Sequence, residues 1–416
     1  MAWADMTLFI TQHTPANTPT YSSRCLGYIG LTMYESVVAG DSIYQSLAGQ
    51  LNGLNSLPKP EPDKQYNWPI ALNAGQSQIL RTIYNQTSNV NKRKIDSLDL
   101  LILSQFSAKT DSGTVRRSVQ YGRAVSDQIF AWSKTDGGHR AYLKNFDKTL
   151  RFKSKPGCWN PPLYAQSFSH FPLHPHWGQN RTFLRQDATI AAPEFIEFDT
   201  IKTSPYYQQF KQVYDKKRVL TQTEKEAAIW WSDDPDETAT PPGHSYQLAT
   251  IAVRKTRPPL IRCAETYART GMAVADAFVD CWKWKYLFFS ERPNNFITQH
   301  IDNQWESFWP DPPFPAFPSG HAIQAAASAT VLTDLYGDRF VFTDSTHVGR
   351  KRDEQRNTEF RARHFTSFWA VAEETANSRF YGGIHTQQDN RAGLEKGREI
   401  GGNINQLQWR KNHQLR

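Results

Sequence analysis

Apolar side chains recur at helical spacing along most of the chain. Over residues 114–132, for example, Val115, Val119, Ala124 and Ile129 fall toward one side of a helix. No stretch alternates apolar and polar residues for longer than a short strand. The pattern therefore predicts a large all-α helical-bundle protein. Its predicted helices are residues 24–38, 70–84, 92–107, 114–132, 206–217, 223–231, a segment after His244, 261–289, 322–335, 360–380 and 391–407.

One long segment, residues 139–205, breaks this helical pattern. It is rich in proline and aromatic residues and has no clear periodicity. A structureless segment of this length inside a compact protein is usually a binding loop or a functional cover. We therefore expect it to cover a site.

Composition narrows the class of protein. The 416 residues are 39% hydrophobic, which is enough for a sizeable core in one large or two medium domains. The net charge of +8 comes from dispersed basic residues, which disfavours nucleic-acid binding and suits a solvated surface or attraction of small anions. No apolar run reaches the roughly 18 residues of a membrane span.

Targeting and redox signals say less. No signal peptide is visible at the N-terminus, and the compartment stays open. The four cysteines, Cys25, Cys158, Cys263 and Cys281, form no Cys-x-x-Cys pair, so zinc and thioredoxin chemistry are not indicated. Free thiols and disulfide pairs are equally compatible with their spacing.

The strongest chemical signal is residues 313–321, Pro-Phe-Pro-Ala-Phe-Pro-Ser-Gly-His. Its prolines forbid a helix, and Ser319-Gly320-His321 then opens the apolar helix predicted at 322–335. A helix start offers unpaired N–H groups to an anion, and glycine lets an oxyanion approach the backbone. On its own, this motif would more often be a helix cap beside a structural histidine.

Two flanking segments change that interpretation. Lys285 and Arg292-Pro293 precede the motif, and Ser378-Arg379, His385 and Asp389 follow it. Arginines offer planar forks for paired oxygens and a lysine offers a point charge. Together these residue types predict a cage for a tetrahedral oxyanion.

This order of motifs resembles the superfamily of type 2 phosphatidic acid phosphatases, bacterial acid phosphatases and vanadium-dependent haloperoxidases. Within it, Trp282 and Phe314 look like the aromatic residues of the haloperoxidases, and the long N-terminal half is absent from small acid phosphatases. The chain is identified as similar to the bacterial iodo- and bromoperoxidases. The resemblance implies one all-α domain, residues 1–416, with two four-helix bundles at roughly 1–200 and 201–416.

The resemblance also implies a cofactor and residue roles. The cofactor would be vanadate, with His385 bonded to the vanadium and its oxygens held by Lys285, Arg292, Ser319, Gly320 and Arg379. His321 would act in acid–base chemistry and help hydrogen peroxide bind, and Lys285 would polarise the bound peroxide. His321, Lys285 and His385 are thus the expected catalytic residues, with hydrogen peroxide and a halide as the expected partners.

Several carboxylates and aromatic rings are assigned to the surroundings of this cage. Asp389 could accept a proton from the second ring nitrogen of His385, or act as a first-turn acid of a helix. Asp234 is the preferred acid to support the arginines, although its neighbour Asp233 is not excluded. The rings of Trp282 and Phe314 are expected at the halide pocket, and core packing is the alternative for both.

The halide and the exact activity are less constrained. Resemblance to the bacterial enzymes favours iodide or bromide, and it suggests a periplasmic or secreted protein. A soluble acid phosphatase with His385 as nucleophile is the alternative enzyme. An anion-binding protein without turnover is the non-catalytic alternative. The organic substrate, if any, and the oligomeric state are not readable from the sequence.

Overall fold

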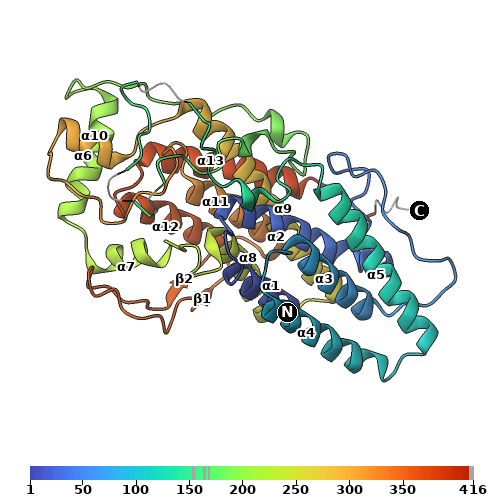
Figure 1. Ribbon diagram of the computed structural model, residues 1–416. Helices are drawn as coiled ribbons and strands as arrows, with labels where there is room; N and C mark the ends of the chain where they lie inside the picture. Colours follow the sequence, from blue (N-terminus) through green and yellow to red (C-terminus); the bar gives the residue numbers. More distant parts are fainter. Residues whose placement is uncertain (152–154, 163–164, 167–168, 412–416) are drawn as a thin grey trace.

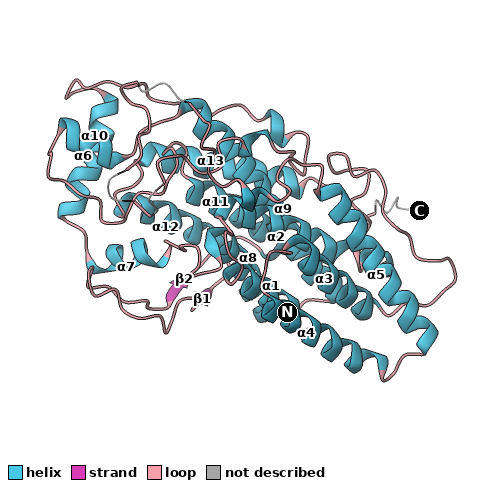
Figure 2. Cartoon of the chain, viewed as in Figure 1, coloured by secondary structure: helices cyan, strands magenta, loops and turns pink. Residues whose placement is uncertain are grey.

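A computed structural model describes residues 1–151, 155–162, 165–166 and 169–411. Helices account for 55% of the structure and strands for two short segments of the described residues, which confirms the predicted all-α class (Figures 1 and 2). Within the described residues, no helix is long and apolar enough to cross a membrane. The α-helices are α1 (Ala2–Gln12), α2 (Pro19–Glu35), α3 (Trp68–Ile83), α4 (Asn89–Ser107), α5 (Ser112–Ser133), α6 (Pro205–Arg218), α7 (Gln222–Trp230), α8 (Thr240–Thr256), α9 (Leu260–Phe288), α10 (Pro293–His300), α11 (Gly320–Tyr336), α12 (Phe368–Tyr381) and α13 (Gln387–Asn405).

The remaining elements are short. Single 3₁₀ turns lie at η1 (Val38–Gly40), η2 (Ala141–Leu143), η3 (Trp177–Gln179) and η4 (Asp187–Thr189). Strands β1 (Phe342–Asp344) and β2 (Arg363–Phe365) pair antiparallel, with Thr343 opposite His364. This hairpin lies beside α7 and α8 (Figure 2).

The helices differ from the predicted ones mainly at their ends. Helices α1 and α10 were not predicted; both are short, with 11 and 8 residues. Helix α12 begins at residue 368 rather than 360, because β2 occupies part of that stretch and Ser367 caps the helix. Helix α13 begins four residues earlier than predicted because Thr386 and Asp389 form a capping box.

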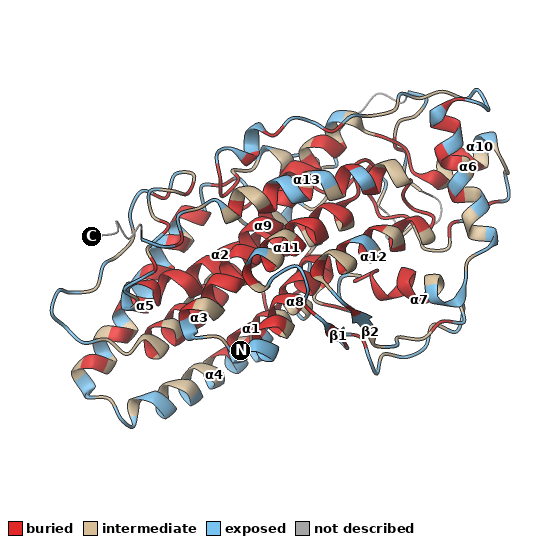
Figure 3. Cartoon of the chain, turned by 180° about the vertical axis from the view of Figure 1, so that it is seen from behind, coloured by how far each residue is buried: buried red, intermediate tan, exposed pale blue. Residues whose placement is uncertain are grey.

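The core runs along the long central helices α2, α9 and α11 (Figure 3). Helices α2 and α9 approach closely: a Cβ on Gly30 would lie 2.4 Å from the Tyr267 carbonyl oxygen, and one on Gly271 would lie 2.4 Å from that of Leu26. Only glycine fits such contacts. The predicted division into two bundles near residue 200 stays a prediction.

Helices α11 and α13 pack in parallel, so that both begin at the same end of the molecule. Gly397 allows this, because a Cβ there would lie 2.2 Å from the Ile323 carbonyl oxygen. At the shared end, the Ser319 N–H donates to the Asp389 carbonyl oxygen at 3.0 Å. Two helix N-termini, each with unpaired N–H groups and a positive dipole end, therefore meet where the sequence predicts an anion.

Candidate active site

Lys285 lies in the last turn of α9 and is fully buried. Its Nζ donates to the carbonyl oxygens of Pro315 (2.8 Å), Ala316 (2.6 Å) and Pro318 (2.6 Å). Burial lowers the pKa of the lysine, but three carbonyl acceptors match the three donors of an ammonium group. Lys285 thus fixes the proline-rich segment and brings a buried positive charge to the start of α11.

Ser319 and Gly320 form that start. Ser319 is the N-cap of α11, and its Oγ accepts from the Ala322 N–H at 3.4 Å. A Cβ on Gly320 would make only ordinary contacts, at 3.6 Å from Trp282, 3.9 Å from Cys281 and 4.0 Å from Lys285. Gly320 also lines the cavity that reaches His321 and His385.

Arg292 lies just before α10 and is held by backbone carbonyls rather than by a carboxylate. Its guanidinium donates to Phe314 O through Nε (3.1 Å) and Nη2 (2.9 Å), and to Ile384 O through Nη1 (2.9 Å). Nη1 also donates to Nε2 of His385 at 3.0 Å. Burial lowers the pKa of Arg292 to about 10, while Asp311 and Asp389 favour its charge.

Arg379, in the last turn of α12, is the second buried guanidinium. It donates through Nη2 to Ala228 O and through Nε to Ser378 Oγ at 3.1 Å. Among the described residues its Nη1 has no hydrogen-bond partner. Burial lowers the pKa of Arg379 to about 10, and Asp234 is the acid that favours its charge most. Such an orphaned buried donor is a position for a ligand oxygen.

His385 lies in the turn between α12 and α13, ahead of the helix that begins at Gln387. Gly383, with φ of 73°, makes this turn possible. The His385 Nδ1–H donates to Asp389 Oδ2 at 2.9 Å, and the same oxygen accepts from the Thr386 N–H at 3.0 Å. Asp389 is therefore both the partner of His385 and the first-turn acid of α13.

The proton of His385 is placed by these two contacts. A guanidinium can only donate, so Nε2 of His385 accepts from Arg292 and carries a lone pair. Burial and the neighbouring charges of Arg292 and Lys285 lower the pKa of His385 well below its usual range. The ring is thus neutral, with Nε2 directed at the cationic groups.

His321 lies in the first turn of α11, beside a different loop. Its Nε2 is 3.4 Å from the carbonyl oxygen of Ser232, which follows α7. Burial, followed by the charge of Arg379, lowers the pKa of His321 to about 3. The ring is therefore neutral, and only weakly basic, at ordinary pH in the anion-free site.

A cavity of about 440 Å³ leads to the two histidines. Trp282 and Phe314 line it with their ring centroids 4.9 Å apart, and the side chain of Asp234 also borders it. Phe146, Gln166 and Leu173 of the long loop cover one side, so the described part of residues 139–205 lies over the site.

The chain therefore gathers every residue of the predicted cage. Lys285, Arg292 and Arg379 supply three buried positive charges, and two helix N-termini point at the same region. The orphaned Nη1 of Arg379, the glycine at the cavity wall and the Nε2 lone pair of His385, which Arg292 holds by a hydrogen bond, fit a tetrahedral oxyanion such as vanadate bonded to a histidine.

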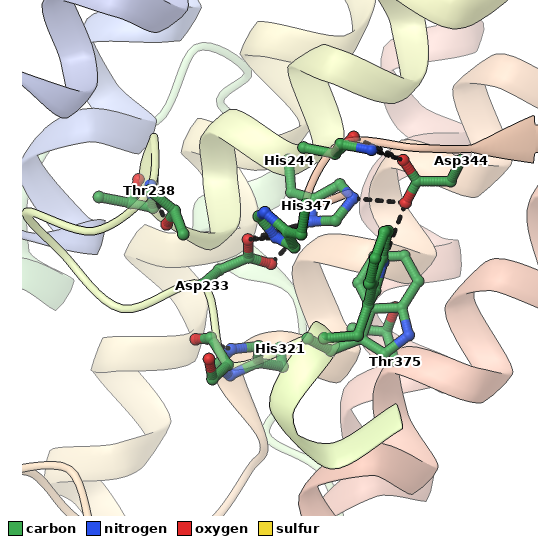
Figure 4. Close-up of polar contacts among 12 residues, drawn as sticks. Asp233, Thr238, His244, His321, Asp344, His347 and Thr375 are labelled. Carbon is green, nitrogen blue, oxygen red and sulfur yellow. Dashed lines mark hydrogen bonds and ion pairs between the residues drawn. The ribbon is translucent and has the colours of Figure 1, made fainter. Parts of the chain in front are cut away.

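Two further features near the site were not predicted: Asp311, and the histidine partners of Asp233. Asp311 is buried near Arg292, its oxygens lack hydrogen-bond partners among the described residues, and burial raises its pKa to about 7. A buried network also joins Asp233, His244, His347 and Asp344, in the same view as His321 (Figure 4). These residues are too scattered for a motif search to group them.

Comparison with known proteins agrees with this geometry. Residues 265–413 match the family model described as VCPO second helical-bundle domain. The first bacterial vanadium-dependent iodoperoxidase has a similar crystal structure, with a TM-score of 0.83, 30% identity, and coverage of 98% of this chain and 95% of that chain.

A bacterial vanadium-dependent chloroperoxidase shares the fold at 14% identity. Its holo form gives a TM-score of 0.70, covering 93% of this chain and 91% of that chain, and its apo form gives 0.72, covering 94% and 93%. No curated protein sequence matches the chain significantly. The iodoperoxidase relative, at 30% identity over nearly the whole of both chains, shows the family: this chain belongs to the vanadium-dependent haloperoxidases and is an enzyme, as the sequence predicted.

Proposed function

We propose that this enzyme oxidises iodide or bromide with hydrogen peroxide to hypohalous acid, using vanadate held at His385. The observation that carries the proposal is the state of His385: a neutral ring whose Nε2 lone pair faces buried cations. When bound, vanadate supplies a Lewis acid that activates peroxide without changing its own oxidation state.

The chain's own groups would hold the oxyanion. Arg292 Nη1 now donates to His385 Nε2, and it would donate to an oxyanion oxygen once that lone pair is used for ligation. Arg379 Nη1, the Ser319 hydroxyl and the N–H groups at the start of α11 are further donors. Asp389 fixes the His385 ring through Nδ1, as the outer partner of a ligating histidine usually does.

His321 would move the proton. The neutral ring is a weak base in the anion-free site, and the negative charge of a bound oxyanion would raise its pKa so that it could take up a proton as hydrogen peroxide binds in the cavity. Lys285 would contribute mainly charge, since its three donors are bound to carbonyls of the proline-rich segment. In this assignment His321 transfers protons, and Lys285 stabilises negative charge.

The cavity favours a large halide. Trp282, Phe314 and Phe278 give it apolar walls, and the cost of moving an ion out of water falls as the ion becomes larger. Iodide loses the least hydration and is the easiest halide to oxidise. The 30% identical relative described as an iodoperoxidase supports the same choice.

Reconstitution tests the proposal. Metal-free protein is loaded with vanadate and assayed with hydrogen peroxide and each halide; we expect iodide to be oxidised fastest, then bromide, then chloride. His321→Ala should lower kcat by about 10²–10⁴-fold, the usual contribution of a positioned acid–base group. His13→Ala, at an exposed histidine at the end of α1, is the matched control and should leave kcat unchanged.

Two outcomes would contradict the proposal. Vanadate-loaded protein that oxidises no halide would exclude the activity. Efficient hydrolysis of a phosphate ester by the metal-free protein, lost in His385→Ala, would instead favour the histidine phosphatase, since phosphate and vanadate have similar shape and charge.

A further inference from the structure

A buried hydrogen-bond network lies behind the active site, and the acid–base and oxyanion assignments above do not use it. Asp233 accepts from His347 Nε2 at 2.8 Å and from His244 Nδ1 at 2.8 Å. The second nitrogen of His244, Nε2, is 2.8 Å from Oδ2 of Asp344. All four side chains are buried, and Figure 4 shows them close to His321.

His244 carries a positive charge that offsets part of the negative charge of this network. Both of its ring nitrogens face carboxylate oxygens, which can only accept, so both must be protonated. Burial opposes this charge, but Asp233 and then Asp344 raise the pKa of His244 to about 10. Trp230 Nε1 donates to the same Asp344 oxygen at 3.0 Å, and the Thr346 N–H donates to the other at 3.0 Å, so the far carboxylate is itself fixed.

A divalent metal would be the other way to neutralise these acids. Ligand atoms of Asp233, His244 and His347 do lie within 4.8 Å of one another. However, two ligands of a tetrahedral zinc ion are about 3.4 Å apart when each bond is about 2.1 Å long. The nitrogen–oxygen distances of 2.8 Å in this network are those of hydrogen bonds. A proton fits the geometry better than a metal.

The network holds a strained turn. Asp233 has a φ of 48°, a left-handed conformation that residues other than glycine rarely adopt. Such strain persists only where surrounding contacts enforce it, and it is common at functional sites. Here the two histidines hold both oxygens of the Asp233 side chain.

The residues on either side of Asp233 both face the active site. The Ser232 carbonyl oxygen lies 3.4 Å from Nε2 of His321. Asp234 is the acid that most favours the charge of Arg379. A carbonyl can only accept, so this long contact favours the tautomer of neutral His321 with its proton on Nε2, which leaves Nδ1 as the acceptor.

We propose that His244 is a positioning residue of this enzyme: its imidazolium, clamped between Asp233 and Asp344, holds the turn of residues 232–234 so that Ser232 selects the proton-accepting tautomer of His321. The kinetic part of this inference rests on the haloperoxidase function proposed above, whereas the tautomer does not.

The tautomer can be measured without any activity. Imidazole ¹⁵N shifts of the full, vanadate-free chain report which nitrogen of each histidine carries the proton, and a His321→Ala sample identifies the His321 signals. We expect the Nε2–H form of His321 in the wild type and a mixture of both tautomers in His244→Gln. An unchanged His321 tautomer in a folded His244→Gln protein would overturn the proposal.

A double-mutant cycle tests the kinetic consequence. His244→Gln should lower kcat for iodide about 10-fold, a part of the total acid–base contribution, with less change in the KM for iodide. In a His321→Ala background the same change should cost nothing further, because the residue through which it acts is gone. An equal loss in both backgrounds would show a merely structural role and reject the inference.

Controls separate the remaining explanations. Asp136→Asn disturbs a buried ion pair elsewhere, Arg24–Asp136, and should lower stability without changing the His321 tautomer. If His244→Gln does not fold, Asp344→Asn removes one side of the clamp with little change of shape, and the same shift is expected. A chelator that alters the tautomer of the wild type would show that a metal, rather than a proton, holds the network.

The two proposals fail separately. Absence of halide oxidation in the wild type would reject the function, and the ¹⁵N measurement would still decide whether His244 positions His321.

Discussion

Buried arginines occur in two contrasting settings in this molecule. Arg24, on α2, donates through Nε to Oδ2 of Asp136 at 2.6 Å; burial opposes its charge, but Asp136 together with neighbouring tyrosines and Cys25 raises the pKa of this arginine. Arg292 and Arg379 are equally buried, but their hydrogen bonds go to carbonyl, hydroxyl and imidazole groups, and burial lowers the pKa of each to about 10.

The difference shows what each site is for. A buried ion pair supplies its own counter-charge and stabilises the fold only when both partners are present. The active site holds cations in excess of its directly bonded acids, and this costs stability in the free protein. A bound oxyanion would supply the missing negative charge. The free energy lost by burying unpaired cations in the free protein would then be regained when the anion binds.

Removing the ligating histidine should give the largest effect. His385→Ala deletes the Nε2 lone pair and is expected to abolish both vanadate binding and halide oxidation, while the Arg24–Asp136 pair is untouched. Vanadate titration of the metal-free protein measures the binding, and a peroxide and iodide assay measures the turnover. Full activity in this variant would mean that the cage does not form the active site.

Breaking the structural pair should give the next largest effect. Asp136→Asn leaves the buried Arg24 charge without its carboxylate and should cost about 3–5 kcal/mol of the free energy of unfolding. Denaturant unfolding measures the loss, and vanadate affinity of the folded fraction should stay as in the wild type. A large drop in vanadate affinity would show that the two regions are coupled.

In the active site, removing a buried arginine should weaken vanadate binding without lowering the stability of the metal-free protein. Arg379→Met removes a buried charge that is not paired to a carboxylate, so the metal-free protein should be as stable as the wild type or more stable. Vanadate affinity should fall about 10–100-fold, the value of one charged hydrogen bond of about 1.5–3 kcal/mol. Strong destabilisation of the metal-free variant would place Arg379 with Arg24, as a structural residue.

The smallest effect concerns pH. His244 has its pKa raised to about 10 in the folded protein, so its proton contributes stability that is complete below about 6.5 and is lost as the pH rises toward 10. Between pH 7 and 8 the wild type should lose about 1 kcal/mol more stability than His244→Gln. Parallel curves from denaturant unfolding would mean that His244 is not charged between its two carboxylates.

The sequence determined the fold class and the chemistry. Helical periodicity located most of the long helices, because an amphipathic face is a local property of consecutive residues. The order of Lys285, Arg292, the Pro-Ser-Gly-His segment, Arg379 and His385 was enough to predict an oxyanion cage and the family. Helix ends were less certain, since α12 and α13 begin at caps whose side-chain contacts decide the boundary.

Only the tertiary structure decided how protons and charges are arranged in the site. It placed Asp234 near Arg379, whereas Asp233 accepts hydrogen bonds from His244 and His347. The sequence alone cannot distinguish the roles of these two adjacent acids. The tautomer of His385, with its lone pair on Nε2, is favoured by a hydrogen bond from Arg292, which lies 93 residues away in the sequence. A hydrogen bond forms between atoms that meet in space, and helix packing, rather than local sequence, brings these atoms together.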